Sequence, residues 1–218
     1  MDCIDPANRG CYKKRMAHPQ ETLSQHPILK RYADMLKRAG RAHNLIALQD
    51  LDDETRLWDR HILNAALLDS FVKPFKHIVD VGSGAGLPGM VLGILNPNVH
   101  IHFVEPRLKR AVFLAETARA LGVKATLHQK RIEECPLFTQ DPEEVCFVSR
   151  AFKPLPDALK ALQKHLEKGS PYFCLKGAQF KDEVRKAETR FSFDLEVFGP
   201  LTHADSWVLS LKNVRSNL

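Results

Sequence analysis

The chain has 218 residues, of which 44% are hydrophobic and 27% charged, and its formal net charge is +6 at pH 7. These values suit one globular domain, or one domain with a small extension. The longest apolar runs are too short for a transmembrane helix, and the polar first 19 residues do not resemble a signal peptide. The five cysteines are scattered and form no Cys-x-x-Cys pair, which argues against a zinc site and for a reducing compartment. We therefore expect a cytoplasmic protein with no membrane segment and no metal.

The first third of the chain is predicted to be a tail followed by helices. The first 20 residues are polar and contain prolines, so we expect them to be flexible. Apolar residues recur at helical spacing over 22–39, and Gly40 is predicted to end that helix. Asp52 and Asp53 are candidate N-caps of a second helix, which runs to about Phe71.

Strands and helices alternate from His77 onward. This order predicts a parallel sheet with helices on both faces. The last two strands, 193–198 and 207–212, are separated by a short loop and should form an antiparallel hairpin. The other strands are expected at 77–81, 100–104, 124–128, 145–149 and 172–175, and the helices after the glycine turn to about 95 and at 107–121, 154–168 and 180–190.

A Rossmann-like, mostly parallel sheet that ends in a β-hairpin is the shape expected of class I S-adenosylmethionine-dependent methyltransferases. The predicted fold is therefore α/β with a helical N-terminal extension. The expected divisions are 1–20 for the flexible tail, 21–75 for the helical extension and 76–218 for the methyltransferase domain.

A glycine-rich turn follows the first strand of the sheet. Its glycines let a ligand approach the backbone closely. The pattern Gly82-x-Gly84-x-Gly86, entered by Asp80, is the S-adenosylmethionine form, whereas a pattern starting at Gly84 and ending at Gly89 fits a dinucleotide. Asp80 would attract a cationic cofactor and repel a pyrophosphate, which favours S-adenosylmethionine.

Three further residues, in two segments of the chain, fit the same cofactor. Glu105 ends the next strand, where a carboxylate can accept both ribose hydroxyls. This contact does not by itself distinguish S-adenosylmethionine from NAD. Ile132 and Glu133 follow the third strand, in the turn that contacts the adenine in methyltransferases.

Two motifs of other methyltransferases are missing from the sequence. The turn after the fourth strand is Ser149-Arg150-Ala151-Phe152, in place of the Asn/Asp-Pro-Pro-aromatic turn of enzymes that methylate exocyclic amines. Cys135-Pro136 reverses the Pro-Cys order of cytosine-carbon enzymes. Both absences favour an acceptor that is already nucleophilic, such as guanine N7, for which positioning and local electrostatics suffice.

The stretch from Asp80 to Gly89 closely resembles the signature of the RsmG (GidB) family of bacterial methyltransferases, which modify guanine N7 in small-subunit 16S ribosomal RNA. The resemblance extends from about Arg41 to the C-terminus and includes Lys109-Arg110, Arg131-Ile132-Glu133-Glu134 and Lys176-Gly177. It departs from the family pattern at Ile46 and Asn64, to which we assign no role. The cofactor contacts that the resemblance implies are Gly82, Leu87, Ile132, Glu133 and Arg150.

Basic residues suggest where RNA would bind. The first 43 residues hold nine lysines and arginines against four acidic residues. Such residues bind phosphate and give affinity more than sequence choice. Our RNA-binding candidates are Asn44, His61, Arg107, Lys109, Arg110 and Lys176.

The predicted function is methyl transfer from S-adenosylmethionine to guanine N7 of 16S ribosomal RNA by a monomer, without a covalent intermediate and with no catalytic residue assigned. One alternative is a methyltransferase of a small molecule or protein on the same fold. A second is a nucleotide-binding regulatory module without catalysis.

Overall fold

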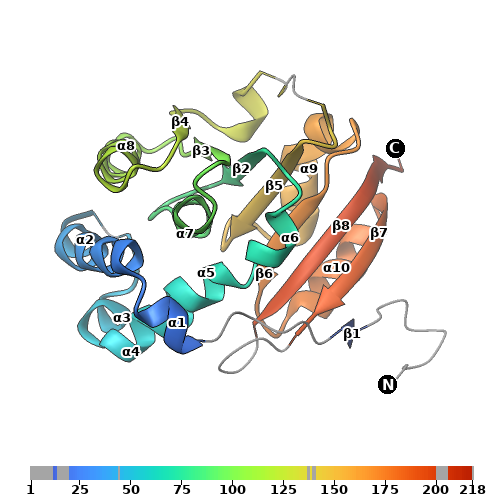
Figure 1. Cartoon of the computed structure of the whole chain (residues 1–218). Helices are drawn as coiled ribbons and strands as arrows, with labels where there is room; N and C mark the ends of the chain where they lie inside the picture. The colour runs from blue at the N-terminus through green and yellow to red at the C-terminus, as the bar shows by residue number, and fades with distance from the viewer. Residues whose placement is uncertain are drawn as a thin grey trace.

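The computed structural model describes residues 12–13, 20–43, 45–136, 138, 141–199 and 206–217. Its centre is an eight-stranded sheet in the order β1-β7-β8-β6-β5-β2-β3-β4 (Figure 1). The strands are β1 (Tyr12–Lys13), β2 (His77–Val81), β3 (His100–Val104), β4 (Ala125–His128), β5 (Val145–Arg150), β6 (Tyr172–Lys176), β7 (Phe191–Phe198) and β8 (Trp207–Ser216). The helices are α1 (Gln20–Ser24), α2 (Pro27–His43), α3 (Leu48–Asp52), α4 (Glu54–Leu57), the π-helix η1 (Trp58–Leu63), α5 (Asn64–Ala66), α6 (Asp69–Val72), α7 (Gly89–Leu95), α8 (Leu108–Leu121), the 3-10 helix η2 (Ile132–Glu134), α9 (Leu155–Leu166) and α10 (Phe180–Glu188).

The predicted α/β fold is confirmed. Strands β2 to β6 pair in parallel, and β8 runs antiparallel to both β6 and β7. The chain thus ends in the expected hairpin, with its last strand inserted between β6 and β7. Short strand β1, which falls in the segment predicted to be a flexible tail, pairs in parallel with β7.

Two apolar layers cover the sheet. Alternate residues of β2 point to opposite faces, so Ile78 joins the core on one side while Val79 and Val81 join the core on the other. Helices α9 and α10 lie behind the sheet in Figure 1, and α7 lies in front. The central strands β2, β3, β5 and β6 are buried on both faces, as a parallel sheet between helices requires.

The helical extension packs into the apolar cluster that contains Ile78, which we call the front core. Leu29, Tyr32 and Leu36 of α2 are fully buried and belong to the same cluster as Ile78 of β2. This packing joins residues 21–75 to the sheet through one shared core. The functional division at residue 75 stays a prediction.

The prediction that Gly40 ends the first helix is wrong, because α2 continues to His43. A Cβ at position 40 would stand 2.7 Å from Leu51 Cδ1, so the glycine is needed for close packing and not as a helix stop. The predicted second helix is also broken into short segments that include the π-helix η1. Asp53 does cap α4, since its side chain accepts a hydrogen bond from the backbone N–H of Arg56.

The cysteines that the structure describes, Cys135, Cys146 and Cys174, are buried free thiols. Cys146 and Cys174 lie in the apolar strands β5 and β6. In the part of the chain described by the structure, none of the helices has the length and apolar character needed to span a bilayer.

Candidate cofactor and acceptor site

The glycine turn after β2 lies at the carboxyl edge of the sheet. Its backbone is held by hydrogen bonds from the N–H groups of Gly82 and Ser83 to the carbonyl of Val104 on β3. Gly82 and Gly84 have φ angles of 71° and 54°, in the left-handed region that favours glycine. A Cβ on Gly84 would lie 3.7 Å from Arg110 Nη1 and from the carbonyl oxygen of Gly82, so the absence of a side chain leaves space for about one carbon atom beside this backbone.

Asp80 lies fully buried beneath the turn. Its Oδ2 accepts a hydrogen bond of 3.0 Å from the backbone N–H of Gly89, at the start of α7. Its Oδ1 is buried and has no hydrogen-bond partner among the described residues. Burial, with a smaller contribution from the nearby Glu105, raises the pKa of Asp80 to about 7. The unpartnered oxygen can accept a hydrogen bond from a ligand's amino group, directly or through water.

Glu105 is buried at the end of β3 and faces the same turn. Its Oε2 accepts from the backbone N–H of Gly84 at 3.0 Å, and its Oε1 accepts from the N–H of Arg107 at 2.9 Å. Each carboxylate oxygen retains a further lone pair. The geometry therefore fixes the carboxylate against the loop while leaving acceptor capacity for ribose hydroxyls.

The helical extension also contacts this turn. The buried Tyr32 hydroxyl of α2 donates a hydrogen bond of 2.8 Å to the carbonyl of Ala85. A Cβ at Gly86 would stand 3.2 Å from that hydroxyl. Residues 53 positions apart in the chain thus shape the loop together, a contribution that the sequence pattern did not reveal.

The other residues predicted to contact the cofactor lie in different surroundings. Leu87 is buried in the front core. Ile132 is buried in the apolar cluster on the opposite face of the sheet, which also contains Val104. Glu133 is exposed and pairs with Lys153 at 2.9 Å. Partial burial acts to raise the pKa of Glu133, but the hydrogen bond and charge of Lys153 outweigh it and lower that pKa. Their contacts with cofactor stay predictions.

A cavity of about 840 Å³ opens at the carboxyl ends of β5 and β6. Phe152 connects it to the glycine turn, because this side chain lines the cavity and its Cδ2 is 2.5 Å from where a Cβ of Gly82 would stand. The residues that line it include four cationic and three acidic side chains, which are Arg60, Arg150, Lys153 and Lys176, and Asp50, Asp59 and Glu183. The cavity is large enough for a nucleotide and is next to the predicted cofactor turn.

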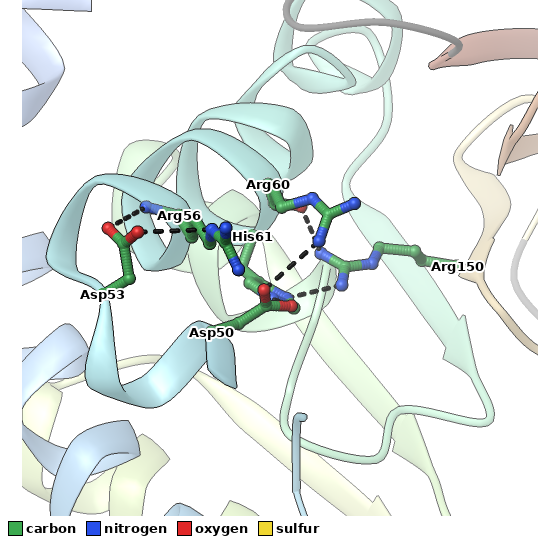
Figure 2. A network of polar contacts seen from close by, with 6 residues as sticks. All are labelled: Asp50, Asp53, Arg56, Arg60, His61 and Arg150. Atoms are coloured by element: carbon green, nitrogen blue, oxygen red, sulfur yellow. Dashed lines mark hydrogen bonds and ion pairs between the residues drawn. The ribbon is translucent and has the colours of Figure 1, made fainter. Parts of the chain in front are cut away.

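Arg150 is held on one side of this cavity by residues of the extension (Figure 2). Its guanidinium donates to the carbonyl oxygen of Arg60 at 3.0 Å and contacts Nδ1 of His61 at 2.5 Å. His61 Nε2 lies 2.9 Å from Asp50 Oδ2. Burial, followed by the positive charge of Arg150, lowers the pKa of His61 to about 4, so the ring is neutral at pH 7.

The RNA-binding candidates fall into two groups. Arg107 and Lys109 are exposed at the start of α8, and Arg110 Nη1 lies 3.7 Å from where a Cβ of Gly84 would stand. His61 and Lys176 line the cavity. Lys176 Nζ already binds Glu183 at 2.6 Å and the carbonyl of Lys153 at 2.8 Å. Asn44 lies outside the described residues, and RNA contact by the whole set stays a prediction.

Sequence reasoning assigned no role to Asp50, Phe152 or Glu183. Asp50 lies in a segment of short helices, and only the fold brings it to His61. Glu183 accepts from the N–H of Leu155 at 2.7 Å and so supports the start of α9 as well as Lys176. Phe152 follows Ala151, whose φ of 50° turns the chain after β5. A positive φ on alanine is uncommon, but it is not visible in a sequence.

The sheet order, the glycine turn and the strand-end acids Asp80 and Glu105 define a class I S-adenosylmethionine-dependent methyltransferase. Comparison with known proteins agrees. Residues 25–204 match the family model described as rRNA small subunit methyltransferase G, GidB. The chain therefore belongs to this family, which confirms the resemblance found in the sequence and S-adenosylmethionine as the cofactor.

Individual relatives support the assignment. The chain is 37% identical over 160 residues to ribosomal RNA small subunit methyltransferase G of Mycobacterium sp. strain KMS, covering 73% of this chain and 70% of that protein. It is 36% identical over 167 residues to the protein of the same name from Acidothermus cellulolyticus, covering 74% and 70%. The magnesium protoporphyrin IX methyltransferase of Synechocystis PCC 6803, solved with bound S-adenosylmethionine, has a TM-score of 0.55 at 13% identity over 91% of this chain and 99% of that one. This last likeness shows the fold alone.

Proposed function

We propose that this protein transfers a methyl group from S-adenosylmethionine to N7 of a guanine in 16S ribosomal RNA of the small ribosomal subunit, in the cytoplasm. The observation that carries the proposal is the juxtaposition of the glycine turn with a cavity lined by four cationic and three acidic side chains, with Phe152 between them. Membership of the rRNA small subunit methyltransferase G family supports the RNA substrate.

Asp80, Gly84 and Glu105 would hold the cofactor. Asp80 offers a buried unpartnered oxygen, Gly84 a backbone position with no side chain, and Glu105 a carboxylate fixed at the loop. When bound, the cofactor supplies a methyl group on positively charged sulfur. The N7 lone pair would accept this methyl group as the sulfur–carbon bond broke, so the positive charge would pass to the base and the acceptor would not need to release a proton.

The cavity suits an acceptor atom that carries no proton. Asp50 and Glu183 already accept hydrogen bonds from cationic side chains, and both ring nitrogens of His61 are engaged. These groups are arranged to hold side chains in place more than to remove a proton. Catalysis then depends on in-line positioning of N7, and the cations Arg60, Arg150 and Lys153 can bind phosphates of the RNA.

The test is methyl transfer from labelled S-adenosylmethionine to small ribosomal subunits that lack the modification. We expect label in 16S RNA, and strand cleavage by aniline after borohydride reduction, a treatment that detects N7-methylguanine. Labelled protein or small molecules with unlabelled RNA would instead support the alternative methyltransferase. Binding of NAD but not S-adenosylmethionine in calorimetry would overturn both.

A further inference from the structure

A chain of polar contacts runs from Asp50 through His61 to Arg150, and the family-based assignment gives no role to the contact between Asp50 and His61 (Figure 2). Its members come from three separate elements, with Asp50 on α3, His61 on the π-helix η1 and Arg150 at the end of β5. Asp50 and His61 are buried, with 6% and 5% of their surfaces exposed. The chain therefore links the helical extension to the sheet at the wall of the cavity.

The hydrogen-bond donors determine the state of His61. A guanidinium can only donate, so Nδ1 of His61 must accept from Arg150. The single proton of the neutral ring is then on Nε2, where it donates to Asp50 Oδ2. Asp50 also accepts from Arg60 Nη1 at 3.2 Å, which fixes its carboxylate from a second side. Asp50 thus selects the one tautomer of His61 that can accept from Arg150.

The other side of Arg150 is available to a ligand. Two of its five N–H groups are used by Arg60 and His61. Among the residues that the structure describes, none of the carboxylates forms an ion pair with it, although the side chain is half-buried in the cavity wall. A half-buried guanidinium that forms no direct ion pair with a carboxylate is a site for an oxyanion, which it binds through paired N–H groups.

We propose that Asp50 and His61 are positioning residues that orient the Arg150 guanidinium and thereby set the affinity of the cavity for an oxyanion. This inference rests on the proposed function for its ligands, which are a phosphate of the RNA or the carboxylate of the cofactor. Replacing Asp50 by Asn removes the charge that selects the Nε2–H tautomer. In the other tautomer an N–H on Nδ1 would face the guanidinium, and Arg150 would lose its support.

The test compares Asp50→Asn with Asp53→Asn. Asp53 lies three residues away and pairs with Arg56, and asparagine is an equally good N-cap, so this variant is the matched control. Calorimetry gives the Kd of S-adenosylmethionine, and filter binding gives the Kd of a 16S RNA fragment. We expect Asp50→Asn to weaken one of them about tenfold, and Asp53→Asn to leave both unchanged.

A weaker RNA Kd assigns the oxyanion to phosphate, and a weaker cofactor Kd assigns it to the cofactor carboxylate; both outcomes support the proposal. A double-mutant cycle with Arg150→Lys separates positioning from a general structural role. If Asp50 acts through Arg150, then Asp50→Asn causes no further loss in the Arg150→Lys background. Additive losses, or two unchanged Kd values, overturn the proposal. If Asp50→Asn does not fold, His61→Gln is used in the same cycle.

These readouts do not require methyl transfer. A protein that binds RNA or cofactor through this chain but forms no N7-methylguanine would contradict the proposed function and still support the inference. Methylation of 16S RNA together with additive losses in the double-mutant cycle would support the proposed function and contradict the inference.

Discussion

A row of histidines on the rear face of the sheet makes stability depend on pH in a way that can be isolated. His102 on β3 lies between His77 and His128, with nitrogen–nitrogen distances of 3.2 Å on both sides. Phe138 packs edge-on against its ring. Burial, followed by the charges of His100, His128 and His77, lowers the pKa of His102 to about 3. We expect His102→Gln to lose less stability than the wild type when the pH falls from 7.5 to 5.5.

The size of this difference follows from proton binding. At pH 5.5 the unfolded chain protonates a histidine of ordinary pKa 6.5, while folded His102 stays neutral. The contribution of neutral His102 to the free energy of unfolding is therefore fully present above pH 6.5, and it is lost as the pH falls from there toward 3. The loss at pH 5.5 is about 1.4 kcal/mol. Because the pKa of His61 is lowered to about 4, His61→Gln should remove a separate loss of the same size, about 1.4 kcal/mol.

The profile of the wild type alone does not reveal this effect. Burial raises the pKa of Asp80 in the folded protein to about 7, above the ordinary value of 3.8. Its folded form therefore binds a proton first, and its contribution rises as the pH falls through 7. Asp80 thus opposes the histidines, and only the difference between wild type and variant isolates His102.

The assay is urea unfolding followed by circular dichroism at pH 7.5 and 5.5, at constant ionic strength. The relevant quantity is the change in unfolding free energy between the two pH values, whatever the cost of the substitution at pH 7.5. Equal changes in wild type and His102→Gln, within about 0.4 kcal/mol, would refute the reasoning. They would mean that His102 is protonated in the folded protein as readily as in the unfolded chain.

Three other predictions concern the site. Gly82→Ala should cost more stability than Gly122→Ala. Both glycines have a φ of 71°, but a Cβ at position 82 would overlap Phe152, whereas nothing lies within 4 Å of a Cβ at position 122. Equal losses of unfolding free energy in urea would contradict the contact with Phe152. Tyr32→Phe should cost about 1–3 kcal/mol and weaken S-adenosylmethionine binding in calorimetry, since it leaves a loop carbonyl unpaired; unchanged affinity would separate the hydroxyl from the cofactor site. Lys109→Gln should reduce the slope of log K for RNA binding against log salt by about 0.7, and an unchanged slope would remove Lys109 from the RNA surface.

Much of the fold was predictable because its signals are local. The apolar runs of β2, β3 and β5 and the breaks between them gave the strand positions to within a residue or two. The short final loop predicted the antiparallel hairpin. The glycine pattern after β2 and Glu105 after β3 are brought together because parallel strands end at the same edge, and Gly84 N–H does bind Glu105.

The extension was predicted less well, because packing outweighed local preference. Gly40 signals a helix end in sequence, yet α2 continues through it to pack closely against Leu51. The second predicted helix became several short ones and a π-helix, whose Arg60 carbonyl accepts from Arg150. Helical periodicity does not distinguish these arrangements, since they place nearly the same residues inside.

The sequence by itself determined the class of fold and the cofactor turn, because strand alternation, glycine spacing and strand-end acids are short-range patterns. The tertiary structure decided what surrounds that turn. Tyr32 reaches the glycine loop across 53 residues of chain, and Asp50 reaches Arg150 through His61 across 100. Such contacts depend on how α2, α3 and η1 pack on the sheet, and the tautomer of His61 exists only once its three partners are in place.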